Sequence, residues 1–317
     1  MTTQPDQIID IKQINDAVKR DAAGLAMESE CRFDGMIEHI AQNIAATRKT
    51  KIVLMSGPSA SGKTTTAHKI KHRLEELDSK AIIISMDNFF IGKDKTPLLP
   101  NGKPDHETIE ALDLQELGIF LSDLIERKTA MLPSFDFFTG RPKEAKTRIE
   151  LGDDDIVILE GIHALSPRIS EGLPAENLFR IFISVETSVY EDGEKLLSPR
   201  NIRFLRRLIR DYKFRGSSAA NTFDMWPQVC RGEDLYILPI RQYADIAVNS
   251  FFPSEIGVIS GTACELLKET PSEPKEDCEK AVRLMSALAK FTEVSQEYIP
   301  GSSLLREFLG DGSFDLS

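Results

Sequence analysis

Residues 57–64 read Gly-Pro-Ser-Ala-Ser-Gly-Lys-Thr, which is a complete G-x-x-x-x-G-K-[ST] phosphate-binding loop. The apolar run 51–56 precedes this loop and is typical of a buried strand. The motif requires a strand before it and a helix after it, so this context separates it from an ordinary glycine-rich turn. The chain is therefore expected to bind a nucleoside triphosphate. Apolar side chains with helical spacing follow the loop, at Ala67, Ile70, Leu74 and Leu77.

Each part of the loop has a task that phosphate chemistry sets. Gly57 and Gly62 let the backbone wrap around a phosphate, and the small residues between them keep the loop narrow. The free N–H groups and the dipole at the start of the next helix attract the anion. We expect Lys63 to reach the β- and γ-phosphates and the Thr64 hydroxyl to bind Mg²⁺. The predicted nucleotide-binding residues are Gly57, Ser59, Ala60, Ser61, Gly62, Lys63, Thr64 and Thr65.

The composition is that of an ordinary globular protein. The chain has 317 residues, 41% hydrophobic and 28% charged, which suits one large α/β domain or two small ones. No apolar stretch of the sequence is long enough to span a membrane, and its first residues do not resemble a signal peptide. We therefore expect a cytoplasmic protein without a membrane partner. The scattered cysteines indicate free thiols in a reducing compartment: Cys31, Cys230, Cys264 and Cys278.

Charge is distributed unevenly along the sequence. The net charge of −11 argues against a broad nucleic-acid-binding surface. Residues 198–216 hold seven basic residues against one acid, a local charge of +6 that leaves −17 on the remainder. Helical spacing places Arg203, either Arg206 or Arg207, and Arg210 on one face. This segment is either a solvated basic face or, given the phosphate loop upstream, an arginine clamp that closes over phosphates.

Short apolar segments alternate with helical patterns after residue 50. Near-continuous Ile, Val and Leu in three of these segments indicate strands buried on both faces of a parallel sheet. Alternation with helices predicts a doubly wound α/β fold. The strands are predicted at 52–56, 81–85, 155–159, 179–184 and 244–248, and the helices at 62–77, 113–127 and 201–213.

Helical patterns also flank this region. Apolar spacing before residue 48 predicts an N-terminal helical extension (1–48), and polar, proline-containing residues 270–275 are expected to link the core to C-terminal helices. We therefore divide the chain into that extension, a phosphate-loop domain (49–268) and a C-terminal helical extension (269–317).

Two acidic residues stand at the ends of predicted strands, on the edge where ligands bind in an open α/β sheet. Asp87 follows 81–85 and can accept a proton from an attacking hydroxyl, help to hold Mg²⁺, or cap a loop. Glu160 follows 155–159 and is a candidate Mg²⁺ ligand or partner of a metal-bound water. His163 lies three residues further on and is either a structural or a functional histidine.

The order of the motifs resembles the uridine kinase/phosphoribulokinase family, and in particular a bacterial uridine kinase-like group. The phosphate loop is followed by Ser-Met-Asp-Asn-Phe-Phe (85–90), Leu-Glu-Gly-Ile-His (159–163) and Arg-Arg-Leu-Ile-Arg-Asp-Tyr (206–212). Phe-x-Phe-x-Thr-Gly (135–140), Trp-Pro (226–227) and Leu-Arg-Glu-Phe (305–308) also fit that group. The resemblance covers roughly residues 35–310. It implies a P-loop kinase with a five-stranded parallel sheet ordered 2-3-1-4-5, helices on both faces and an arginine-bearing lid at 200–216.

The resemblance also implies roles for individual residues. Asp87 is the general base and a neighbour of the metal, Glu160 is a second carboxylate on the Mg²⁺ side, and Lys63 and Thr64 serve ATP. Asp105 or Glu107 binds the ribose hydroxyls, and the spacing does not decide between them. The residues implied to face the substrate or the transferred phosphoryl group are Phe90, Phe135, His163, Arg207, Arg210 and Arg215.

The family implies phosphorylation of a nucleoside, uridine or cytidine, at its 5′-hydroxyl. Phe90 and Phe135 replace tyrosines of the animal uridine–cytidine kinase pattern, Gly140 replaces a histidine and Ser217 an arginine. Because these are the polar groups that read the base, we expect weak base selectivity.

Several alternatives stay open. The acceptor can instead be another small polyol or sugar phosphate, or the chain can be an ATP-binding module without turnover. A nucleic-acid-binding protein that uses the 200–215 helix is disfavoured by the charge of −17 elsewhere. A homo-oligomer is possible by family analogy.

Overall fold

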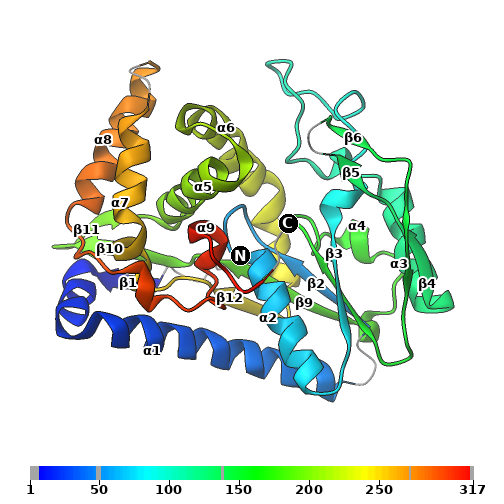
Figure 1. Ribbon diagram of the computed structural model, residues 1–317. Helices are drawn as coiled ribbons and strands as arrows, with labels where there is room; N and C mark the ends of the chain where they lie inside the picture. Colours follow the sequence, from blue (N-terminus) through cyan, green and yellow to red (C-terminus); the bar gives the residue numbers. More distant parts are fainter. Residues whose placement is uncertain (1–6, 48–50, 137–138, 271–272, 315–317) are drawn as a thin grey trace.

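The computed structural model describes residues 7–47, 51–136, 139–270 and 273–314. The main sheet of this part has five parallel strands in the order β12-β9-β2-β8-β3, which reads 2-3-1-4-5 when they are numbered along the chain. The predicted α/β fold is confirmed, and the strand that leads into the phosphate loop is central (Figure 1). The bounds of these strands are β2 (Ile52–Ser56), β3 (Ala81–Ser85), β8 (Ile156–Glu160), β9 (Leu178–Ser184) and β12 (Ile246–Asn249).

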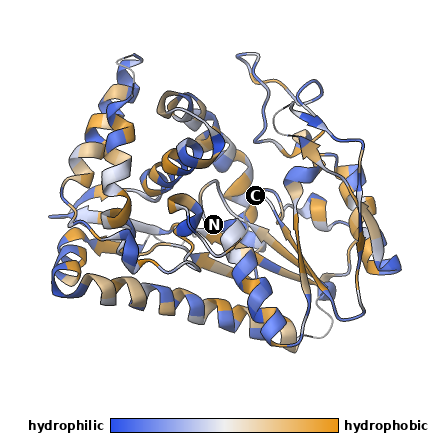
Figure 2. Cartoon of the chain, viewed as in Figure 1, coloured by the Kyte–Doolittle hydropathy of each residue, from blue (hydrophilic) through white to orange (hydrophobic). Residues whose placement is uncertain are grey.

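The strands are apolar because both faces of the sheet are covered. In β2, Val53 and Met55 belong to one buried cluster, whereas Ile52 and Leu54 belong to a second cluster on the opposite face. Figure 2 shows the central strands as mostly hydrophobic, and the surrounding helices as mixed. Hydrophobic residues on both sides of every strand are what a parallel sheet between two helical layers requires.

Helices on the two faces come from different parts of the chain. The face of Val53 packs against α1 (Ile11–Ala46), α2 (Lys63–Glu76), α5 (Pro199–Arg215) and α7 (Glu255–Lys268). The face of Leu54 packs against α3 (Leu114–Arg127) and α4 (Pro167–Ser170). The helices that complete the structure are α6 (Ala219–Gly232), α8 (Lys275–Leu288) and α9 (Arg306–Leu309).

In the described residues, three smaller sheets and several short 3-10 or π-helical turns lie outside the main sheet. A three-stranded sheet joins β1 (Gln7–Asp10), β10 (Thr187–Glu191) and β11 (Glu194–Leu197). Two antiparallel pairs are formed by β4 (Thr129–Leu132) with β7 (Thr147–Glu150) and by β5 (Phe135–Asp136) with β6 (Arg141–Pro142). The turns are η1 (Met86–Phe89), η2 (Ile109–Ala111), η3 (Ala175–Asn177), η4 (Glu233–Ile237), η5 (Pro239–Tyr243) and η6 (Gln296–Tyr298).

The terminal extensions share one apolar core with the phosphate-loop region. Ile37 and Ile40 of α1, Ile70 of α2, and Phe308 of α9 all belong to the same buried cluster. The helical patterns predicted before residue 48 form α1, which consists of two helical segments that meet at a kink at Asp21, where the backbone is not helical. The domain boundaries proposed from the sequence stay a prediction, and residues 48–50 and 271–272 lie outside the described residues.

No helix in the described ranges has the length and apolarity needed to cross a membrane.

Candidate active site

The phosphate loop opens into a cavity of about 520 Å³ at the carboxyl ends of β2, β3 and β8. We call it the main cavity. It brings together most of the residues that the sequence singled out, but Gly57, Thr65, Asp105 and His163 do not line it. Asp87 and Glu160 meet here because parallel strands present their carboxyl ends at one edge. The lining residues are Ser59, Ala60, Ser61, Gly62, Lys63, Thr64, Asp87, Phe90, Lys93, His106, Glu107, Phe135, Thr139, Gly140, Glu160, Gly161, Ile162, Arg207, Arg210, Arg215, Met225 and Glu307.

The geometry of the loop explains its glycines. A Cβ at Gly57 would lie 1.9 Å from the carbonyl oxygen of Ile183 on the neighbouring strand, so any side chain there forces the loop away from the sheet. Gly62 has φ +89, a left-handed conformation that glycine adopts without strain, and a Cβ there would meet Leu304 at 2.3 Å. The Ser61 hydroxyl is buried without a hydrogen-bond partner, as expected for a group that faces a phosphate.

Lys63 stands at the start of α2 with its ammonium group folded back on the loop. Its Nζ donates to the carbonyl oxygens of Gly57 at 2.9 Å and Pro58 at 3.2 Å. Burial lowers the pKa of Lys63, and the carboxylates of Glu160, Glu307 and Asp87 oppose this shift. The ammonium group is therefore held among acids and is available to phosphate oxygens.

Asp87 projects into the main cavity from η1, directly after β3. The Ser85 hydroxyl accepts a hydrogen bond from the Asp87 backbone N–H at 3.4 Å and fixes this turn. The carboxyl group is open to the cavity, yet the protein around the cleft removes it from bulk water and raises its pKa. Lys63, Arg215 and Arg210 act in the opposite direction. A carboxylate with a raised pKa in a cleft is suited to accept a proton.

Glu160 is the last residue of β8, one position earlier relative to the strand end than the sequence suggested. Burial raises its pKa to about 7, partly opposed by Lys63. Nearby Asp87 pushes the pKa in the same direction as burial. The two carboxylates therefore repel each other when both are ionised, and a cation between them relieves that repulsion.

The donor set fits a magnesium–nucleotide complex. Thr64, Asp87 and Glu160 line the same cavity and offer only oxygen ligands, which Mg²⁺ prefers. Within the described ranges no group of three acidic, histidine or cysteine side chains could hold a metal by itself. Mg²⁺ typically takes its remaining ligands from phosphates and water.

The arginines of α5 divide into two kinds. Arg207 Nη1 donates to the Ser59 hydroxyl at 2.9 Å, and Arg210 donates to Asp211 at 2.9 Å, and both arginines line the main cavity. Arg215 lines it too and keeps 60% of its side chain exposed. Arg207 and Arg210 fit the clamp that helical spacing suggested, and Arg215 is a residue that the family resemblance implied.

Arg203 and Arg206 correct the clamp hypothesis. Arg203 forms a buried ion pair with Glu233 at 2.7 Å, and Arg206 forms one with Glu255 at 2.7 Å. Both arginines are almost completely buried, and Arg206 also donates to the Ser250 carbonyl oxygen at 2.6 Å. The two therefore fasten α5 to the core and do not face the cavity.

The two candidate sugar-binding carboxylates are placed differently. Glu107 lines the main cavity, and burial raises its pKa to about 7 despite the nearby Arg207. Asp105 is buried beside the cavity, where it pairs with Arg231 at 3.1 Å and accepts a hydrogen bond from the Glu107 backbone N–H at 3.1 Å. Asp105 thus fixes the segment that carries Glu107.

Aromatic rings form one wall of the cavity. The Phe90 ring lies 5.5 Å from the Phe135 ring and 6.0 Å from the His106 ring. Residues 137–138 of the Phe-x-Phe-x-Thr-Gly motif lie outside the described residues. His163 does not line the main cavity: it is 3% exposed, its Nε2 has no hydrogen-bond partner, and burial lowers its pKa to about 4. His163 is therefore a neutral histidine behind the site.

Glu307 of α9 is a residue of the cavity that the sequence did not identify. Its Oε2 accepts a hydrogen bond from the Thr65 hydroxyl at 3.1 Å, and its Oε1 lies 4.0 Å from Arg210 Nη1. The Leu-Arg-Glu-Phe motif was noted only as part of the family resemblance, and no local pattern marks its glutamate as a site residue.

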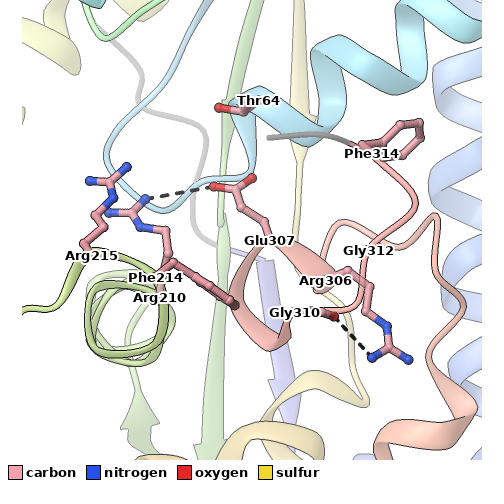
Figure 3. A pocket seen from close by; sticks show the side chains of 9 residues that line it. All are labelled: Thr64, Arg210, Phe214, Arg215, Arg306, Glu307, Gly310, Gly312 and Phe314. Carbon is pink, nitrogen blue, oxygen red and sulfur yellow. Dashed lines mark hydrogen bonds and ion pairs between the residues drawn. The ribbon is translucent and has the colours of Figure 1, made fainter. Parts of the chain in front are cut away.

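Glu307 also lines a second cavity of about 380 Å³, the side cavity, which shares Thr64, Arg210, Arg215 and Glu307 with the main cavity (Figure 3). Figure 3 shows the Glu307 carboxylate pointing toward Arg210, with Thr64 beyond it. The residues that line the side cavity are Thr64, Arg210, Phe214, Arg215, Arg306, Glu307, Gly310, Gly312 and Phe314.

The sequence of this chain is similar to those of known proteins. The model of the phosphoribulokinase/uridine kinase family matches residues 52–256. A uridine kinase of Lactobacillus helveticus is 33% identical over 66% of this chain and 91% of its own length. One of Lactobacillus johnsonii is 31% identical over 67% of this chain and 92% of its own length. A solved structure titled a possible uridine kinase from Bacillus stearothermophilus has a TM-score of 0.46 and 19% identity, covering 69% of this chain and 99% of that one.

Proposed function

Because the chain belongs to the phosphoribulokinase/uridine kinase family, we propose that it transfers the γ-phosphoryl group of ATP to the 5′-hydroxyl of a nucleoside, with uridine and cytidine as first candidates. The observation that carries this proposal is the position of Asp87. Its carboxyl group lines the main cavity together with Lys63 and Thr64 of the phosphate loop and with Glu107 and Phe90. A donor phosphate and an acceptor hydroxyl can therefore meet beside Asp87, the proposed general base.

In the proposed reaction, the acceptor oxygen attacks the γ-phosphorus and the bond to the β–γ bridging oxygen breaks. The hydroxyl proton passes to Asp87, and ADP leaves with the bonding electron pair. Lys63, Arg210 and Arg215 neutralise charge on the phosphoryl oxygens, and Thr64 and Glu160 would hold Mg²⁺. Positioning and charge neutralisation supply most of the rate in phosphoryl transfer.

On the acceptor side, Glu107 is the better candidate for the ribose hydroxyls because Asp105 is already paired with Arg231. Phe90 and Phe135 offer apolar surface on which a base can stack. Apolar slots separate related ligands by only about 10–200-fold, so we expect modest discrimination among bases.

The alternative acceptor, a sugar phosphate or other polyol, is favoured by the absence of tyrosine hydroxyls at Phe90 and Phe135. A non-catalytic ATP-binding module stays a further alternative. The nucleic-acid rival loses support, because Arg203 and Arg206 of the 200–215 helix are buried in ion pairs with Glu233 and Glu255.

A coupled ADP-release assay tests the proposal. Uridine, cytidine, purine nucleosides, ribulose 5-phosphate and simple sugars are offered with and without Mg²⁺. Asp87→Asn is expected to lower turnover by about 10²–10⁴ while leaving ATP affinity nearly unchanged, as for loss of a general base. Near-normal turnover of Asp87→Asn would refute the assignment of the base. Turnover with sugar phosphates alone would refute the nucleoside acceptor, and ATP binding without any product would support the non-catalytic module.

A further inference from the structure

The C-terminal segment that carries Glu307 lies outside residues 52–256, which the family model matches, yet it enters the nucleotide site. Glu307 accepts from the hydroxyl of Thr65, which stands in the first turn of α2. The free N–H groups and the positive dipole end of such a helix are where phosphate oxygens bind. A carboxylate of the protein therefore lies in the region that attracts the nucleotide's phosphates.

This carboxylate is held in place by the core. Leu304 and Phe308, on either side of Glu307, are completely buried, and the Arg206 guanidinium lies 5.2 Å from the Phe308 ring. The Lys213 ammonium donates to the Leu309 carbonyl oxygen at 2.9 Å. Leu304 fills the space that a side chain at Gly62 would need. Glu307 cannot leave the site without disturbing these contacts.

Resting on the proposed function, we propose that Glu307 makes the donor site discriminate against metal-free nucleotide. Its fixed negative charge repels a bare polyphosphate, and a divalent cation on the phosphates removes much of that repulsion. Glu307 also lies against Arg210, so it offsets part of the positive charge that would otherwise bind any polyphosphate. In this role Glu307 is a positioning and selectivity residue, and Asp87 keeps its role in catalysis.

The expected size follows from Coulomb's law. Two unit charges about 6–8 Å apart at an effective dielectric constant of about 20 change a binding constant by roughly 30- to 100-fold, and screening by salt lowers this to about tenfold. Glu307→Gln removes the charge and keeps an oxygen that can accept from Thr65. This variant is therefore expected to bind metal-free ATP about tenfold more tightly, while its affinity for ATP with Mg²⁺ changes much less.

Isothermal titration calorimetry with ATP in excess MgCl₂ and in EDTA measures both affinities directly, without turnover. The measured quantity is the ratio of the dissociation constant in EDTA to the dissociation constant in excess MgCl₂. Glu297→Gln is the matched control, because it removes the same charge from an exposed position in the same C-terminal segment and should leave the ratio unchanged. Glu307→Asp keeps the charge and should retain discrimination, even if shortening the side chain weakens binding overall.

The outcomes separate the two proposals. If Glu307→Gln lowers this ratio because it binds metal-free ATP more tightly, the inference is supported. A merely structural role of Glu307 would instead weaken the binding of ATP equally with and without Mg²⁺. Wild-type binding with a ratio that Glu307→Gln leaves unchanged overturns the inference and leaves the proposed kinase standing. Failure of the wild-type protein to bind ATP in either condition overturns both.

Discussion

The buried pair of Arg206 and Glu255 predicts a large loss of stability when only one partner is removed. Arg206→Met keeps much of the aliphatic volume but removes the 2.7 Å contact with Glu255 and the 2.6 Å hydrogen bond to the Ser250 carbonyl oxygen. Both side chains of the pair are fully buried, so Glu255 is left without a cation in the interior. Breaking such a pair typically costs about 3–5 kcal/mol.

Urea unfolding followed by the fluorescence of Trp226, the single tryptophan, measures this loss. The double variant Arg206→Met/Glu255→Gln removes the orphaned charge and is expected to recover much of the loss, because the glutamine can still accept from the Phe252 N–H. A single variant within about 1 kcal/mol of wild type would show that the pair does not hold α5 in place.

The pH dependence gives a second check with a defined sign. Burial already raises the pKa of Glu255 although Arg206 lowers it, so removing Arg206 raises the pKa further. Above pH 4.5, the ordinary pKa of a glutamate side chain, the folded variant then still binds a proton that the unfolded chain has released. The stability gap between wild type and Arg206→Met should therefore widen as pH rises above that value and narrow in acid. A gap that widens toward acid would contradict the reasoning.

The remaining predictions concern the site and its frame. Burial raises the pKa of Glu160 to about 7, and the ionised form is needed at a cation, so kcat/KM should rise with pH through about 7. A rising limb near the ordinary glutamate value in the pH–rate profile would contradict this. Gly57→Ala should weaken ATP binding at least about tenfold in calorimetry, because its Cβ would lie 1.9 Å from the Ile183 carbonyl oxygen. Gly118→Ala, in helix α3 with open space around it, should instead stabilise the protein by about 0.5–1 kcal/mol in urea unfolding. If Gly118→Ala weakened ATP binding as much as Gly57→Ala, the steric argument would be refuted.

The sequence was sufficient where structure is set by local pattern. The phosphate loop, the apolar strands and the acids at the ends of β3 and β8 were predicted, because periodicity and strand ends depend on neighbouring residues. The sequence only partly distinguishes the arginines of α5 that line the main cavity from those that are buried in ion pairs. Helical spacing puts Arg203 and Arg207 on one face, but it does not show that Glu233, thirty residues along the chain, covers the first and leaves the second at the cavity.

Long-range contacts explain what sequence reasoning missed. Asp105 and Glu107 are two residues apart and chemically alike, and only the approach of Arg231 distinguishes them. Glu307 follows Arg306 in a short motif that also holds the buried Leu305 and Phe308, and nothing in that motif marks the glutamate as part of the site. Its position depends on α9 packing against α5 and on the hydrogen bond from Thr65 of α2.

The hydrogen bond between Thr65 and Glu307 joins residues 242 positions apart. Closing so long a loop costs entropy before any contact repays it, and contacts of this kind form slowly. The P-loop emerges from the ribosome well before α9 exists, so a nascent chain carries a phosphate loop without its glutamate. The order of residues along the chain therefore determines when this site is complete. The main cavity has its full set of charges only after the polypeptide between Thr65 and Glu307 has been synthesised and packed.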